Sequence, residues 1–101
     1  MSDVLVYRLY GEDAESLKQA LLTDEVASRA NLLFRDAKLL TDREGTYVRV
    51  LGTEEQLRRV EELLAGRAVR VEGGELEEVI KKLSEEDERA LAGLGGMFGG
   101  D

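Results

Sequence analysis

The sequence predicts an α+β fold, in which strands and helices alternate along a single domain over residues 1–84. Three observations support this prediction. Segments rich in β-branched and aromatic residues alternate with segments in which apolar residues recur every three or four positions. Glycines separate several of these segments. A chain of 101 residues, 43% of them apolar, can bury one hydrophobic core.

The first part of the chain predicts a strand followed by helix. Residues 4–10 combine valine, leucine and tyrosine and are followed by Gly11, which is typical of a strand and the turn after it. Residues 13–35 have a helical composition with two apolar stripes. Thr23 and Asp24 interrupt them, so we expect a break or a new helix start there.

The middle of the chain predicts a β-hairpin. Residues 37–42 and 46–51 have strand character and are separated by a short polar loop. Gly45 closes this loop at a position that often requires a positive φ angle. We therefore expect the second and third strands to pair through this turn.

The second half predicts a helix, a strand and another helix. Thr53 and Gln56 have the spacing of a capping box that opens a helix, and Gly66 ends it. Residues 67–71 predict the fourth strand. After the next glycine pair, apolar residues follow the i, i+3, i+4, i+7 spacing of a third amphipathic helix: Leu76, Val79, Ile80 and Leu83.

The resulting order is β-α-β-β-α-β with an extra C-terminal helix and a flexible Gly-rich tail over residues 85–101. The simplest compact arrangement of this order is the ferredoxin-like split βαβ sandwich. It has two helices on one face of a four-stranded antiparallel sheet. The other face then needs an explanation.

Strand alternation assigns a set of polar and aromatic side chains to this second face. With the fourth, first and third strands as neighbours, the set forms one candidate binding or dimer surface: Arg8, Tyr10, Tyr47, Arg49 and Arg70. Three alternatives follow. In the first, the third helix covers the face, or a second copy of the chain covers it and forms a homodimer. Single-stranded RNA stacks on it. A small anionic ligand binds in an amino-acid-sensing, ACT-like arrangement of a homo-oligomer.

Composition argues against several classes of function. The chain has no cysteine and no histidine, so we expect no metal site, no cofactor and no enzyme activity. The net charge of −8 repels phosphate backbones and disfavours the RNA alternative. No apolar run is long enough to cross a membrane, and the first residues do not resemble a signal peptide. We therefore expect a cytoplasmic protein.

The C-terminal segment differs from the rest. An acidic stretch precedes large apolar residues that are set among five glycines in residues 93–101. On a helix, Leu91, Leu94 and Phe98 share one face, which is the spacing of a ligand that binds in a groove. The alternative is a terminal helix whose leucines pack on the protein's own core.

The segment Ala90-Leu-Ala-Gly-Leu-Gly-Gly-Met-Phe-Gly99, after its acidic stretch, resembles the C-terminal tail of archaeal ribosomal stalk proteins. In that family the tail is a flexible hook that recruits translation factors, chiefly GTPases. The resemblance implies that the anchors here are Leu91, Leu94, Met97 and Phe98. It is confined to this tail, because the Ala-rich hinge and the helical dimerisation domain of stalk proteins have no counterpart. The sequence thus predicts a non-enzymatic binding or assembly module with a protein partner.

Overall fold

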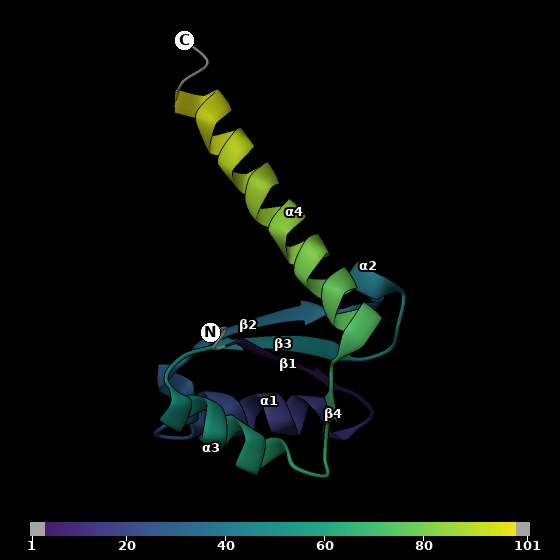
Figure 1. Cartoon of the computed structure of the whole chain (residues 1–101), viewed down its shortest axis with the longest axis vertical. Helices are drawn as coiled ribbons and strands as arrows, with labels where there is room; N and C mark the ends of the chain where they lie inside the picture. Colours follow the sequence, from purple (N-terminus) through teal and green to yellow (C-terminus); the bar gives the residue numbers. More distant parts are fainter. Residues whose placement is uncertain (1–3, 99–101) are drawn as a thin grey trace.

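The computed structural model describes the backbone of residues 4–98 and the side chains of residues 4–87. Figure 1 shows a layered molecule with a sheet between helices. The elements in chain order are β1 (Val4–Leu9), α1 (Asp13–Thr23), the 3-10 turn η1 (Ala27–Arg29), β2 (Asn31–Asp36), α2 (Ala37–Thr41), β3 (Thr46–Leu51), α3 (Glu54–Leu64), β4 (Val69–Arg70) and α4 (Gly73–Phe98). The predicted α+β class is confirmed.

The sheet has the order β2-β3-β1-β4, and every neighbouring pair is antiparallel. β1 pairs with β3 over six residues, from Val4 opposite Leu51 to Leu9 opposite Thr46. β4 contributes only two residues, which pair with Tyr7 and Arg8. The fourth, first and third strands are therefore neighbours, as the sequence predicts.

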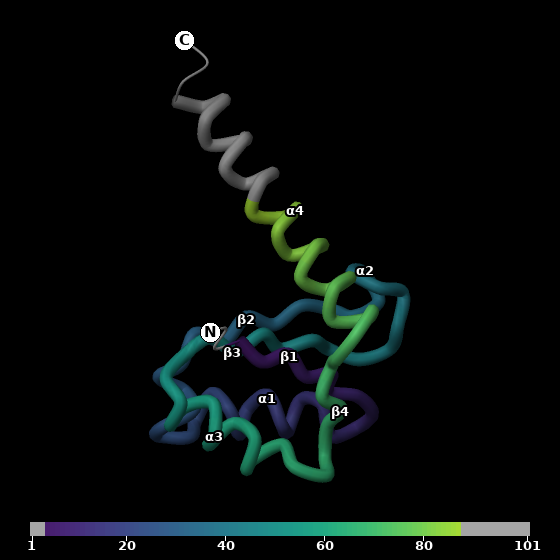
Figure 2. Tube along the Cα trace, in the orientation of Figure 1, coloured from purple at the N-terminus to yellow at the C-terminus, as the bar shows by residue number. Residues whose placement is uncertain are grey.

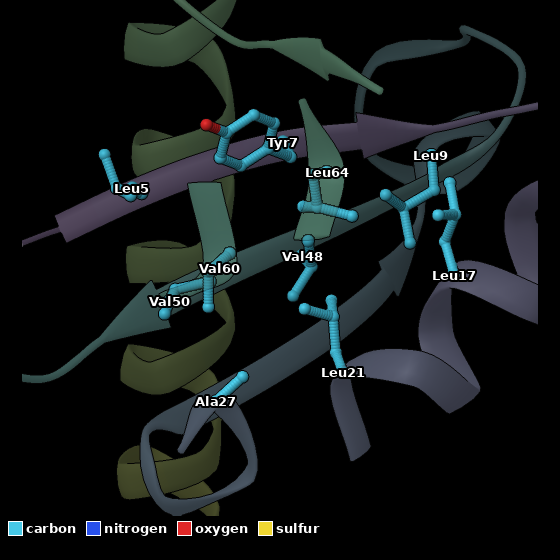
Figure 3. Close-up of a cluster of buried hydrophobic side chains, with 10 residues drawn as sticks. All are labelled: Leu5, Tyr7, Leu9, Leu17, Leu21, Ala27, Val48, Val50, Val60 and Leu64. Atoms are coloured by element: carbon cyan, nitrogen blue, oxygen red, sulfur yellow. The ribbon is translucent and has the colours of Figure 1, made fainter. Parts of the chain in front are cut away.

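One face of the sheet packs on α1 and α3, which lie side by side beneath it in Figure 1. Alternate residues of β1 and β3 point to this face, as predicted, and meet the apolar stripes of the two helices. Figure 3 shows this cluster, which we call the α1/α3 core. Its buried members are Leu5, Tyr7, Leu9, Leu17, Leu21, Ala27, Val48, Val50, Val60 and Leu64.

The opposite face is covered by α2 and the first turns of α4, as the tube in Figure 2 also shows. We call the second cluster the α4 core. Its buried members are Val6, Ala37, Leu40, Tyr47, Val71, Val79 and Leu83. Among the three alternatives for this face, cover by the third predicted helix is therefore the arrangement found.

The predicted second strand is wrong in position. Residues 31–35, which the sequence assigned to helix, lie in β2, and residues 37–42, which it assigned to strand, contain the short helix α2. β2 pairs with β3 over six residues, and these long-range contacts outweigh the helical spacing of its leucines. Asp36 then starts α2, since its carboxylate accepts the N–H of Lys38. Gly45 has φ of +106°, the positive value expected for that position.

The predicted faces of the last strand are reversed. Ala68 packs on the α1/α3 core, and Val71 lies in the α4 core. Arg70 pairs with Tyr7, whose side chain points to α1 and α3, and forms an ion pair with Glu61 of α3. A strand of two residues is too short for alternation to fix its register from sequence.

α4 begins at the glycine pair and runs to Phe98, so it passes through the predicted domain boundary between residues 84 and 85. Figure 1 shows it rising steeply from the sheet. The predicted anchors Leu91, Leu94, Met97 and Phe98 lie outside the residues whose side chains are described. Within the described chain, no helix combines the length and the apolar character needed to cross a bilayer.

Candidate functional site: the polar cluster at the base of α4

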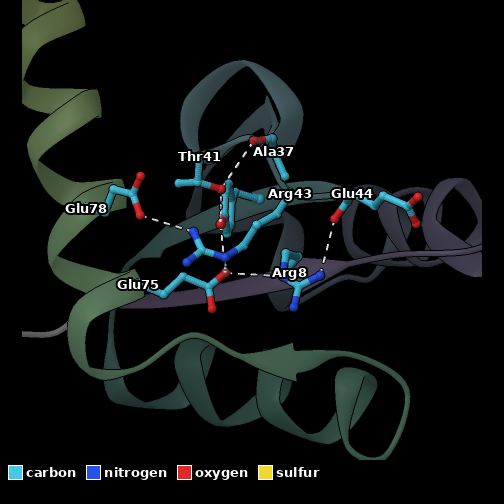
Figure 4. Close-up of polar contacts among 8 residues, drawn as sticks. Arg8, Ala37, Thr41, Arg43, Glu44, Glu75 and Glu78 are labelled. Carbon is cyan, nitrogen blue, oxygen red and sulfur yellow. Dashed lines mark hydrogen bonds and ion pairs between the residues drawn. The ribbon is translucent and has the colours of Figure 1, made fainter.

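The central group of this site is the carboxylate of Glu75, in the first turn of α4 (Figure 4). Its Oε2 atom accepts the hydroxyl proton of Tyr47 at 2.7 Å and the Nε–H of Arg8 at 3.2 Å. Arg43 Nε lies 3.8 Å from the same oxygen. Two guanidinium groups and one phenol thus surround a carboxylate with little solvent exposure.

Strand register brings the first two partners together. Arg8 of β1 lies directly opposite Tyr47 of β3, and both side chains point to the α4 face. Thr41, at the end of α2, approaches the Tyr47 oxygen at 2.7 Å. The Thr41 hydroxyl also donates to the Ala37 carbonyl at 3.3 Å, so it links α2 to the Tyr47 phenol.

Burial raises the pKa of Tyr47, and the Glu75 carboxylate raises it further, while the contacts with Thr41 and Arg43 act in the opposite direction. The phenol therefore keeps its proton at neutral pH. The hydrogen bond to Glu78 is the main reason that the pKa of Arg43 is raised above its usual value. Each charged side chain of the cluster thus forms an ion pair: Arg8 with Glu75, and Arg43 with Glu75 and Glu78.

Further ion pairs extend the cluster along α4. Arg43 Nη1 donates to Glu78 at 3.1 Å, one helical turn beyond Glu75. Arg35 of β2 donates to Glu86 at 2.8 Å, a further two turns along. Side chains from β1, β2 and the segment before β3 thus all contact one face of α4. Directional contacts of this kind fix the orientation of the helix on the sheet as well as its distance from it.

This arrangement provides structural contacts. Glu75 accepts two hydrogen bonds and lies beside a second cation, so its contacts hold α4 against the sheet. Within the described chain, no three acidic side chains converge on a common point.

The predicted surface residues separate into three environments. Arg8, Tyr47 and Arg49 share the α4 face, since Arg49 lies opposite Val6. Tyr47 is only 1% exposed and lies beneath α4. Tyr10 follows the strand, where the Arg8 guanidinium lies 5.7 Å from its ring centre.

Arg70 lies on the opposite face, so the five residues do not form one surface.

Sequence reasoning missed the acidic partners Glu75, Glu78 and Glu86. A signal for them was present: Glu75 stands four residues before Val79, and Glu86 three residues after Leu83, on the face of α4 that packs on the sheet.

The fold and this cluster define a class only: an α+β domain with an antiparallel sheet between two helical layers. No protein-family model matches the chain, and searches of curated proteins and of solved structures likewise find no match.

Proposed function

We propose that the chain is a non-enzymatic binding or assembly module that presents helix α4 to a protein partner. The observation that carries the proposal is the polar anchoring of the first half of this helix. Ion pairs at Glu75, Glu78 and Glu86 tie its first half to the sheet, yet the helix runs on to Phe98. A rigid base supports a binding segment because less orientational freedom is lost when a partner binds.

The finer fold proposal is a ferredoxin-like sandwich extended by α4. The strand order β2-β3-β1-β4 supports it, since β1 and β3 occupy the centre and each lies between two antiparallel neighbours. α1 and α3 on a single face support it as well.

The proposed partner is a translation factor of the GTPase type, on the strength of the stalk-like C-terminal sequence. Leu91, Leu94, Met97 and Phe98 would be the anchors. Three of them have the i, i+3, i+7 spacing that a hydrophobic groove recognises. The acidic stretch before them would favour a groove with a basic rim.

Isothermal titration calorimetry against a purified archaeal translational GTPase tests this function. We expect Leu94→Ala and Phe98→Ala each to weaken binding at least about tenfold, the loss typical of an interface anchor. Leu39→Ala is a matched control, because Leu39 is 83% exposed on α2 and is not one of the proposed anchors. Equal affinity of all four proteins would refute the proposal, as would wild-type binding by a chain that ends after Asp87.

The RNA alternative has less support. Stacking of bases on the sheet needs exposed aromatic rings, but Tyr47 is buried beneath α4 and its hydroxyl contacts Glu75. RNA could reach this ring only after α4 had moved. Homodimer formation and a cytoplasmic location stay predictions, and sedimentation equilibrium of the purified chain would measure the first.

A further inference from the structure

A cavity of about 410 Å³ lies between α4 and the adjoining ends of β1 and β3. Its volume falls within the range of roughly 300–1,000 Å³ that is usual for small-molecule sites. Much of its wall is apolar and comes from Val4, Leu51, Ile80 and Leu83. Two charged residues of opposite sign also line it, namely Arg49 on β3 and Asp87 on α4.

Arg49 has an unsatisfied polar atom. Its Nε is buried and has no hydrogen-bond partner among the described residues. Buried N–H groups of a charged side chain are costly to leave without an acceptor, so such an atom calls for one. The neighbouring arginines on this face are satisfied, since Arg8 and Arg43 both contact the Glu75 carboxylate. Guanidinium groups bind carboxylates best, through paired N–H donors.

Asp87 supplies the complementary charge. It lines the same cavity, but within the described chain neither Asp87 nor Arg49 belongs to an ion pair. The cavity thus offers a cation, an anion and an apolar wall. A ligand that satisfies all three carries a carboxylate, an ammonium group and an aliphatic body.

We propose that this cavity binds a free aliphatic α-amino acid. The ligand carboxylate accepts from Arg49, the ammonium group donates to Asp87, and the alkyl side chain packs on Val4, Leu51 and Ile80. The site is separate from the proposed anchors in the C-terminal part of α4, so it does not depend on the proposed function. Because its walls come from the sheet and from α4, a bound amino acid also strengthens the attachment of this helix.

Titration of the ¹⁵N-labelled full chain with L-leucine, followed by NMR, tests the proposal on the unaltered protein. We expect saturable shifts of the backbone amides around Arg49, Ile80 and Leu83. Three analogues each lack one feature: 4-methylpentanoate has no ammonium group, leucinamide has no carboxylate and glycine has no alkyl chain. Each should bind about tenfold more weakly or worse, the usual effect of losing one charged contact or a buried side chain.

The same titration is repeated with the variant Arg49→Met, which keeps most of the length of the side chain and removes its charge. Arg58→Met is the matched control, because Arg58 lies on α3 and pairs only with exposed Glu54 among the described residues. We expect leucine binding to be lost in the first variant and retained in the second. Absence of saturable shifts at about 10 mM leucine, or equal binding of leucine and 4-methylpentanoate, would overturn the proposal. Unchanged leucine affinity in folded Arg49→Met would do so too.

Discussion

The two faces of the sheet are covered in different ways. The α1/α3 core joins two helices to β1 and β3 through apolar side chains. The α4 core buries fewer apolar residues, and polar side chains around Glu75 and along α4 add to it. Apolar burial is strong but non-directional, whereas hydrogen bonds and ion pairs specify an orientation. The comparison indicates that one layer supplies stability and the other fixes the direction of a helix.

The same substitution on the two faces should reveal the largest difference. Leu64 of α3 is fully buried in the α1/α3 core, and Leu83 of α4 lies 4% exposed in the smaller cluster. We expect Leu64→Ala to lower the free energy of unfolding by about 3–5 kcal/mol and Leu83→Ala by about 2–3 kcal/mol, within the range for buried leucines. Urea unfolding followed by circular dichroism measures both. A larger loss for Leu83→Ala would mean that the α4 layer carries the stability.

The polar cluster should give the next largest effect. Glu75→Gln leaves Arg8, Arg43 and Tyr47 without the carboxylate that they share. We expect a loss of about 1–3 kcal/mol, the usual cost of leaving charged donors unsatisfied.

The distribution of the effect matters more than its size. Hydrogen exchange should become faster in residues 75–87 of α4 and change little in α1. Glu77→Gln is the control, because Glu77 is exposed on the same helix. If exchange rises equally in α1, the cluster does not act on α4 in particular.

Sequence reasoning predicted the elements whose signals are local. The strand at β1, the capping box before α3 and the alternating faces of β1 and β3 are all present. It misplaced β2, because Leu33 and Phe34 continue a helical stripe with Val26 and Ala30 and also fit a strand. Pairing with β3 decides between the two, and this pairing is a long-range property.

The candidate site was predictable only where it depends on local signals. Alternation placed Arg8, Tyr47 and Arg49 on one face. The contact of Tyr47 with Glu75 depends on how α4 crosses the sheet, and no local pattern contains that angle. The reversed face of Arg70 follows from a fourth strand of only two residues.

A local polar contact in the α1/α3 layer should have a smaller effect than the Glu75 cluster. Thr53 accepts the N–H of Gln56 at 3.2 Å, and the Gln56 side chain accepts the N–H of Thr53 at 2.9 Å. We expect Thr53→Ala to cost about 1 kcal/mol of unfolding free energy. Thr53→Ser keeps the hydroxyl and should unfold at nearly the wild-type urea concentration. A loss as large as that of Glu75→Gln would remove the distinction between local and interlayer polar contacts.

The smallest expected effect is a pH dependence that originates in the α1/α3 layer. Asp24, at the end of α1, accepts hydrogen bonds from Arg59 of α3 and from the N–H groups of Val26 and Ala27. The contact with Arg59 is the main reason that the pKa of Asp24 is lowered from 3.8 to about 2, and the Ala27 N–H contributes next.

The folded state binds this proton more weakly than the unfolded state does, so protonation favours unfolding. The contribution of Asp24 is therefore fully present above its unfolded pKa of 3.8 and is lost as the pH falls towards about 2. Asp24→Asn keeps an oxygen for the backbone N–H groups but removes the charge. We expect its difference from wild type in unfolding free energy to shrink steadily over this interval, and Arg59→Met to behave in the same way. A difference that stays constant from pH 4 to 2 would show that the link between α1 and α3 at this point, like the core beside it, owes its strength to packing and not to charge.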